Sequence, residues 1–244
     1  MPRIFADAAL LQGNEVTLTG EAHHYLTRVL RLHAGDEVVV FDGRGQDIRA
    51  TIARAGSQGV TLNLGARTQM QLARTAPVTL LQGLPRADRM DLIVQKASEL
   101  GAARLIPVRT ARTARGQQGR PDRWTRIALE AARQCGRAVC LELADVMTLE
   151  EALRALPAGD PGDRVVPWEE APDAPALGRL ISPAPSSVTV LIGPEGGLGP
   201  EEAGLAIDAG FRVATLGPRI LRTETAAIAV LAIVQARLGA MGSL

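Results

Sequence analysis

The sequence is poor in aromatic residues and in cysteine. Aromatic side chains make up 2% of the 244 residues, so we do not expect a surface that binds RNA by stacking many unpaired bases on aromatic rings. The two cysteines, Cys135 and Cys140, have no histidine nearby, and their spacing fits neither a disulfide-rich domain nor a common zinc site. We expect two reduced, partly buried thiols and no metal site.

Long apolar runs and the common hydrolase motifs are also missing. No apolar run reaches the ~18 residues that a membrane-spanning helix needs. Residues 1–20 contain Asp7 and Glu15 without a central apolar block, so no signal peptide is expected. The sequence contains no GxSxG, no HExxH and no P-loop lysine motif. We therefore expect a cytoplasmic globular protein without membrane contact, and no ordinary hydrolytic chemistry.

Lysine is nearly absent, and the positive charge is concentrated in the middle of the chain. Lys96 is the only lysine, and the net charge is +1. Residues 74–140 hold 13 basic and 5 acidic side chains, whereas residues 141–244 hold 7 and 14. Genomic base composition explains the ratio of arginine to lysine but not this clustering. A cluster of arginines is typical of a surface that binds phosphate groups.

The first seventy residues have the pattern of a small β-barrel. Short alternating or β-branched runs, separated by glycine-containing turns, indicate strands at residues 15–18, 37–42, 47–53 and 59–64. One helix is predicted between them, at residues 21–32. Its apolar face would contain Tyr25, Val29 and Leu32, with Leu26 and Leu30 beside them, and Arg28 and Arg31 would lie on the other face.

From Pro77 onward the pattern becomes that of an α/β domain. Short, mainly apolar runs predict fully buried parallel strands at residues 78–82, 104–108, 138–142, 164–167, 188–192 and 212–216. Helical patterns lie between them at residues 88–100, 123–134, 149–156 and 200–209. Alternating strands and helices indicate a largely parallel sheet. We therefore expect two domains, 1–73 and 74–244.

Two loops are the best candidates for a binding site, because each follows a buried strand and leads into a helix. Residues 193–200 are rich in glycine, which allows a ligand to approach the backbone. A tight strand-to-helix connection explains these glycines equally well. Residues 216–226 combine Arg219, Arg222 and Glu224, and Thr223 fits the cap of the following helix. The remaining interpretation is chemistry driven by binding at backbone loops, such as group transfer from a bound cofactor to RNA.

Six motifs closely resemble the bacterial RsmE family, uridine N3-methyltransferases of 16S ribosomal RNA in the SPOUT superfamily. They occur in the same order along the chain: RVLRL (28–32), FDGR (41–44), QKASELG (95–101), EAARQCGR (130–137), LIGPEGGL (191–198) and LGPRILRTETA (216–226). The resemblance implies an α/β fold with an N-terminal PUA-like β-barrel (1–73) and a C-terminal SPOUT-type trefoil-knotted domain (74–244). It also implies a homodimer that uses S-adenosylmethionine.

The resemblance further implies the site residues. The cofactor would contact Trp168, Leu191, Gly193, Glu195, Gly196, Gly197, Leu216, Gly217, Ile220, Leu221 and Arg222. Arg222 is the predicted stabiliser of a uridine anion, and Glu195 is predicted as a proton acceptor, a ribose contact or a structural carboxylate. The predicted contacts to RNA of the small ribosomal subunit are Arg28, Arg31, Arg112, Arg115 and Arg120.

Two other functions remain open at this point. Another SPOUT reaction, such as ribose 2′-O-methylation of transfer or ribosomal RNA, predicts the same fold. A noncatalytic RNA-binding factor in ribosome assembly predicts RNA binding without cofactor affinity.

The C-terminal helix supports the expected dimer. Residues 226–234 are all apolar, so no side of this segment favours contact with water. The sheet would cover Ile228, Leu231 and the side of Gln235, and a second copy would cover Val230, Ile233, Val234 and the flank of Arg237. Complete burial by other helices of the same chain is the alternative.

Overall fold

The computed structural model describes residues 1–69, 75–114, 116–157 and 162–241, which form two compact units. The first unit contains the N-terminal sheet together with Leu129–Cys140, and the second contains the rest of the described chain. The two units are therefore not separated at a single position in the sequence. The boundary predicted between residues 73 and 74 lies outside the described residues.

The first unit is built on a five-stranded sheet with the order β1-β3-β4-β5-β2. Its elements are β1 (Arg3–Phe5), the short 3-10 helix η1 (Ala8–Leu11), β2 (Glu15–Leu18), β3 (Glu37–Phe41), β4 (Gln46–Ala55) and β5 (Val60–Gln69). The four predicted strands are confirmed as β2, β3, β4 and β5. β1 was not predicted, and it pairs in parallel with β3, whereas the other pairs are antiparallel. Alternation is clear in β3, where Val38 and Val40 are fully buried and Glu37 is exposed.

The predicted helix at residues 21–32 is present only in part. An α-helix, α1 (Gly20–His24), continues as one turn of π-helix, η2 (Tyr25–Val29), in which Leu30 N–H donates to Tyr25 O at 3.0 Å. A π-turn has one more residue than an α-turn, so it rotates the following side chains away from the predicted face. Leu26 is fully buried, but Val29 is 58% exposed, and its predicted place on the apolar face is wrong.

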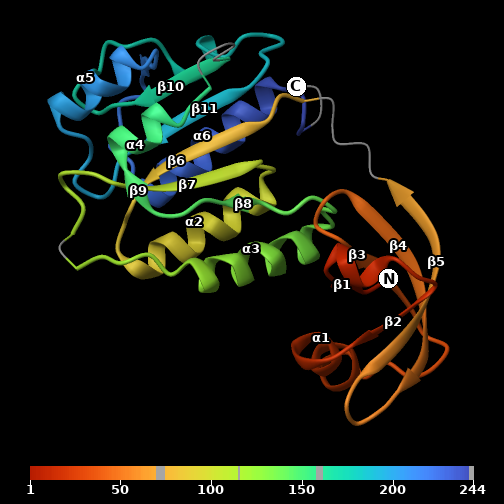
Figure 1. Ribbon diagram of the computed structural model, residues 1–244. Coiled ribbons are helices and arrows are strands. Elements are labelled where there is room, and N and C mark those ends of the chain that lie inside the picture. The colour runs from red at the N-terminus through yellow and green to blue at the C-terminus, as the bar shows by residue number, and fades with distance from the viewer. Residues whose placement is uncertain (70–74, 115, 158–161, 242–244) are drawn as a thin grey trace. The chain divides into compact units, whose positions relative to one another are not determined.

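The second unit contains a parallel sheet with the order β12-β10-β11-β6-β7-β8, and β9 also pairs with β7 (Figure 1). The strands are β6 (Val78–Gly83), β7 (Arg104–Arg109), β8 (Glu142–Leu143), β9 (Met147–Thr148), β10 (Asp163–Pro167), β11 (Val188–Ile192) and β12 (Arg212–Ala214). The α/β class is confirmed. One predicted strand, at residues 138–142, is wrong. Cys140 N–H donates to Gly43 O at 2.9 Å within the first unit, and only Glu142 joins the second sheet.

Helices cover both faces of this sheet and form a three-layered domain. They are α2 (Ala87–Glu99), α3 (Pro121–Cys135), α4 (Leu149–Arg154), α5 (Pro200–Asp208) and α6 (Thr223–Arg237), with the short 3-10 helix η3 (Leu177–Arg179). One core packs α2, α6 and the start of α3 against β6, with Leu80, Val94 and Val230 fully buried. The other packs α4 and α5 on the opposite face, where Ala152 and Ala206 are buried.

The C-terminal helix is covered by its own chain more completely than predicted. Val230 and Val234 are both fully buried in the core that α2 and α6 share. Their predicted availability to a second copy is therefore wrong, because α2 occupies that side. Of the three apolar residues predicted to face a partner, only Ile233 is exposed, at 37%, and Arg237 beside them is exposed too. Within the described part of the chain, no helix has the length and apolar character to cross a membrane.

Candidate functional site

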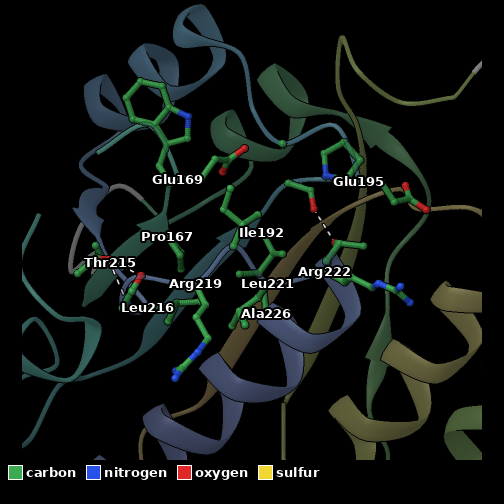
Figure 2. Close-up of a pocket in the computed structure, with 18 of the residues that line it drawn as sticks. Pro167, Glu169, Ile192, Glu195, Thr215, Leu216, Arg219, Leu221, Arg222 and Ala226 are labelled. Atoms are coloured by element: carbon green, nitrogen blue, oxygen red, sulfur yellow. Dashed lines mark hydrogen bonds between the residues drawn. The ribbon is translucent and has the colours of Figure 1, made fainter. Parts of the chain in front are cut away.

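A cavity of about 350 Å³ opens at the carboxyl ends of three neighbouring strands, β10, β11 and β12. Parallel α/β sheets bind ligands at this edge. The residues following these strands line the cavity together with the first turn of α2 and the start of α6 (Figure 2). The lining contains Arg89, Pro167, Trp168, Glu169, Ile192, Gly193, Pro194, Glu195, Gly197, Thr215, Leu216, Gly217, Pro218, Arg219, Ile220, Leu221, Arg222, Thr223 and Ala226.

The glycine-rich loop packs so closely that larger side chains would not fit. A Cβ added to Gly83 at the end of β6 would lie 2.6 Å from Pro194 N, and real Cβ atoms do not approach backbone so closely. Gly197 has φ +69°, a left-handed conformation that favours glycine, and an added Cβ would lie 1.9 Å from Glu169 Oε1. The glycines therefore serve close packing, and they leave backbone groups near the cavity.

Three side chains hold this loop, and one of them, Trp168, also lines the cavity. Arg112 Nη1 donates to Gly196 O at 2.8 Å, and Trp168 Nε1 donates to Leu198 O at 3.2 Å. Glu202 accepts from Gly199 N–H at 3.0 Å and from Ala111 N–H at 2.7 Å. These bonds connect the loop to β10 and to the arginine-rich segment after β7.

A charged cluster lies at one side of the cavity. Glu195 Oε1 accepts from Arg86 N–H at 2.9 Å and lies 3.3 Å from Arg89 Nη1. The same Arg89 nitrogen lies 3.7 Å from Glu224 Oε2. Arg222 is exposed, and its guanidinium has no hydrogen bond or ion pair with any described residue. Among the described residues, Arg222 is therefore available to bind a negatively charged group, whereas Glu195 and Glu224 are already paired with Arg89.

Nine of the eleven predicted cofactor contacts line the cavity. The two others lie beside it: Leu191 is a fully buried residue of β11, and Gly196 faces Arg112. Figure 2 shows Arg219 and Arg222 extending in different directions from their loop, with Leu221, Ile192 and Ala226 between the two loops. The structure thus brings together two segments that are well separated in the sequence.

Sequence reasoning missed several lining residues, including Arg89, Glu169, Ile192 and Thr215. Ile192 and Thr215 adjoin predicted loops, so the strand-end rule is enough to find them. Arg89 carries no local signal, because only the pairing of β6 with β11 brings α2 to this edge.

The predicted capping role of Thr223 is wrong. Arg222 is at the N-cap without a side-chain bond, and the Thr223 hydroxyl donates to Gly193 O at 2.6 Å.

The predicted RNA contacts lie in different environments. Arg28, Arg31 and Arg120 are exposed, and their guanidinium groups have no partner among the described residues. Arg31 has φ +55°, the only positive φ of a non-glycine residue in the described chain. Arg112 is bonded to the glycine-rich loop as described above, and Arg115 lies outside the described residues.

The cysteines are free, as predicted, but they are not alike. Cys135 is exposed, so its predicted partial burial is wrong, whereas Cys140 is partly buried. Burial raises the pKa of the Cys140 thiol, although nearby Arg137 acts in the opposite direction. In the described ranges, no group of three or more His, Cys, Asp or Glu side chains is arranged to hold a metal ion.

Comparison with known proteins identifies the family. Residues 73–235 match the RNA methyltransferase domain, and residues 18–64 match the RNA methyltransferase PUA domain. The chain belongs to the RNA methyltransferase family. This methyltransferase is 30% identical over 239 residues to ribosomal RNA small subunit methyltransferase E of Bacillus subtilis, covering 93% of each chain. It is 35% identical over 228 residues to the Synechocystis protein of the same name, covering 91% of this chain and 73% of the relative.

A solved structure supports the same assignment. This methyltransferase is similar to ribosomal RNA small subunit methyltransferase E of Neisseria gonorrhoeae bound to S-adenosyl methionine, with a TM-score of 0.86 and 30% identity. The match covers 96% of this chain and 97% of that one. The predicted enzyme class, an RNA methyltransferase, is confirmed, and so is the predicted α/β fold with an N-terminal PUA-like domain.

Proposed function

We propose that the protein transfers a methyl group from S-adenosylmethionine to N3 of a uridine in 16S ribosomal RNA of the small subunit, in the cytoplasm. The observation that carries the proposal is the cavity between residues 192–197 and 215–223, at the ends of three parallel strands. Both loops belong to motifs that resemble the RsmE family. The cofactor and the RNA in the relatives' names agree with this assignment.

The residues of the cavity suit S-adenosylmethionine. The volume of about 350 Å³ lies within the ~300–1,000 Å³ typical of small-molecule sites. Ile192, Leu216 and Leu221 provide an apolar surface for an adenine ring, and glycine backbone offers hydrogen-bonding groups beside it. Glu169 supplies negative charge near a ligand that carries an ammonium and a sulfonium group. We therefore assign this cavity to the cofactor.

The chemistry needs a deprotonated uracil. When bound, the cofactor supplies an electrophilic methyl group, whose bond to sulfur breaks with its electron pair as the bond to N3 forms. The N3 proton must leave, and the negative charge on the uracil must be stabilised. Arg222 is the group we assign to this role, because it lines the cavity and has no competing partner among the described side chains.

Glu195 was predicted in three roles, and its contacts favour the structural one. Arg86 N–H and the Arg89 guanidinium both approach Oε1. A proton acceptor would have to compete with these two donors. We propose that Glu195 mainly holds the glycine-rich loop and that the N3 proton leaves to solvent water.

RNA binding is assigned to exposed arginines of both units. Arg28 belongs to the π-turn, and Arg31 follows it in a left-handed conformation. Such turns and strained residues are frequent at functional sites. We propose that Arg28, Arg31 and Arg120, with Arg112 and Arg115, contact RNA phosphates.

We also propose a homodimer. Ile233 on α6 is 37% exposed, and its neighbours Ala229 and Ala232 are only partly covered. Small residues beside an exposed isoleucine allow close packing of a second helix. A second copy of the chain would cover this side of α6.

The decisive experiment uses labelled S-adenosylmethionine and small ribosomal subunits that lack the modification. Mass spectrometry of the nucleosides should show label as N3-methyluridine. Label on a ribose 2′-oxygen would replace this proposal with another SPOUT reaction. RNA binding without affinity for S-adenosylhomocysteine in calorimetry would instead indicate a noncatalytic assembly factor.

A further inference from the structure

The hydroxyl of Thr223 connects the two loops of the cavity. Thr223 is the first residue of α6, and the N-cap position before it, where a threonine commonly caps a helix, is occupied by Arg222. Here the hydroxyl instead donates to the carbonyl oxygen of Gly193, the first residue of the glycine-rich loop, at 2.6 Å. Both residues line the cavity. The bond therefore fixes the start of α6 to the end of β11.

A third residue determines the direction of this bond. Gln82 Nε2 lies 2.9 Å from Gly83 O and 2.9 Å from Thr223 Oγ1. Because Gly83 O can only accept, the nitrogen of the amide must be the atom that faces both groups. Gln82 therefore donates to Thr223 Oγ1. The single hydroxyl hydrogen of Thr223 is then left for Gly193 O, which can also only accept.

The backbone around this chain of bonds allows little adjustment. Gln82 pairs in register with Ile192, the residue before Gly193. The next residue, Gly83, packs against Pro194 without room for a Cβ atom. The two strand ends are thus fixed to each other, and α6 is connected to them through the Thr223 hydroxyl.

Gln82 contributes to this arrangement at a cost to stability. Its side chain is fully buried, and Oε1 has no hydrogen-bond partner among the described residues. A buried unpaired carbonyl oxygen destabilises the folded state. An apolar side chain of similar size would avoid that cost, but it would not orient the hydroxyl.

We propose that Thr223 is a positioning residue for cofactor binding, whose hydroxyl sets the separation of the two cavity loops, and that Gln82 orients this hydroxyl. The inference depends on the assignment of the cavity to S-adenosylmethionine in the proposed function. Without the hydroxyl, Gly193 O loses its donor and the start of α6 is free to shift. The cofactor contacts of both loops then weaken together.

The test compares Thr223→Val, which replaces the hydroxyl by a methyl group, with Thr223→Ser, which keeps it. Calorimetry with S-adenosylhomocysteine should show binding roughly tenfold or more weaker for Thr223→Val and within about threefold of wild type for Thr223→Ser. In methylation assays, Thr223→Val should raise KM for the cofactor more than it lowers kcat. Thr148→Val is the matched control, because Thr148 caps α4 away from the cavity. It should lower Tm without changing cofactor affinity.

A second variant keeps the proposal testable if Thr223→Val does not fold. Gln82→Met should weaken binding of S-adenosylhomocysteine several-fold without lowering Tm, because it also removes the unpaired oxygen. Wild-type affinity in folded Thr223→Val, or in Gln82→Met where Thr223→Val does not fold, would overturn the proposal. Equal loss in Thr223→Ser and Thr223→Val would do so too. Calorimetry needs no RNA, so methylation of a different RNA atom would refute the proposed function and leave this result valid.

Discussion

Arg89 Nη1 lies 3.3 Å from Glu195 Oε1, which connects the first turn of α2 to the glycine-rich loop. The same nitrogen is the nearest positive charge to Glu224 Oε2, at 3.7 Å in the first turn of α6. Glu224 Oε2 is buried and has no hydrogen-bond partner in the described chain. One guanidinium therefore balances the charge of both segments that border the cavity.

We expect Arg89→Met to weaken both cofactor binding and stability. Exposed ion pairs contribute about 0–1 kcal/mol, and Arg89 is about a third exposed. Loss of the partner of the more buried Glu224 adds to this. We expect the free energy of unfolding to fall by about 1 kcal/mol, which lowers Tm by about 2–4 °C. Differential scanning calorimetry measures the stability, and titration with S-adenosylhomocysteine measures the affinity.

Lys96→Met is the control for this experiment. Lys96 pairs with Glu99 on the same helix at 2.7 Å, and both side chains are about a third exposed. This change should reduce Tm slightly and leave cofactor affinity unaltered. An equal loss of affinity in both variants would mean that α2 acts through its general stability rather than through Arg89.

Local sequence patterns were sufficient to predict most strands and helices of the second unit. β11 is buried at every residue and β6 at every residue but Thr79, so their mainly apolar runs are easily found. The two candidate loops were found by the same logic, since they follow such strands and precede helices. Glycine at residues 193 and 197 was expected to let a ligand approach the backbone, with a tight connection as the alternative, and the close packing of both residues against their own chain agrees with the alternative.

The remaining features depend on contacts that no local pattern encodes. The π-turn at Tyr25–Val29 adds one residue to a helical turn, and the apolar spacing alone does not reveal it. Thr223 has the sequence signature of a helix cap, but a nearby carbonyl of β11 competes for its hydroxyl. Val230 and Val234 are covered by α2, which only the tertiary packing determines.

Arg28→Ala/Arg31→Ala should change the salt dependence of RNA binding. Each phosphate contact contributes about −0.7 to −0.9 to the slope of log K against log salt concentration. Loss of two contacts should therefore flatten the slope by about 1.5, with no change in affinity for S-adenosylhomocysteine. Filter binding or fluorescence anisotropy over a range of salt concentrations measures the slope.

Arg154→Ala/Arg179→Ala removes the same charge from exposed positions of the second unit. If this control flattens the slope as much as Arg28→Ala/Arg31→Ala does, the effect is one of net charge. An unchanged slope in Arg28→Ala/Arg31→Ala would mean that both arginines are only solvated side chains.

The two cysteines should react at different rates. The thiolate is the reactive form, and burial raises the pKa of Cys140, so this thiol remains protonated to higher pH than an exposed one. Cys135 is exposed and should be alkylated first. Mass spectrometry after timed treatment with iodoacetamide at several pH values gives both rates, and Cys135→Ser should remove the fast phase. Faster reaction of Cys140 would contradict the burial of its side chain.

Ile233→Asp should disrupt the proposed dimer while the chain stays folded. Aspartate at Val230 or Val234 would place a charge in the core and unfold the protein, so neither position can test association. Ile233 is exposed, and the same change there leaves the core intact. Because α6 begins at Thr223 beside the cavity, loss of the partner should also weaken cofactor binding.

Analytical ultracentrifugation at micromolar concentration should show a wild-type dimer and a folded Ile233→Asp monomer. Ile207→Asp, at an isoleucine of α5 that is 47% exposed, should remain dimeric. A monomeric wild-type protein would refute the dimer, and a monomeric Ile233→Asp with normal cofactor affinity would refute its coupling to the site.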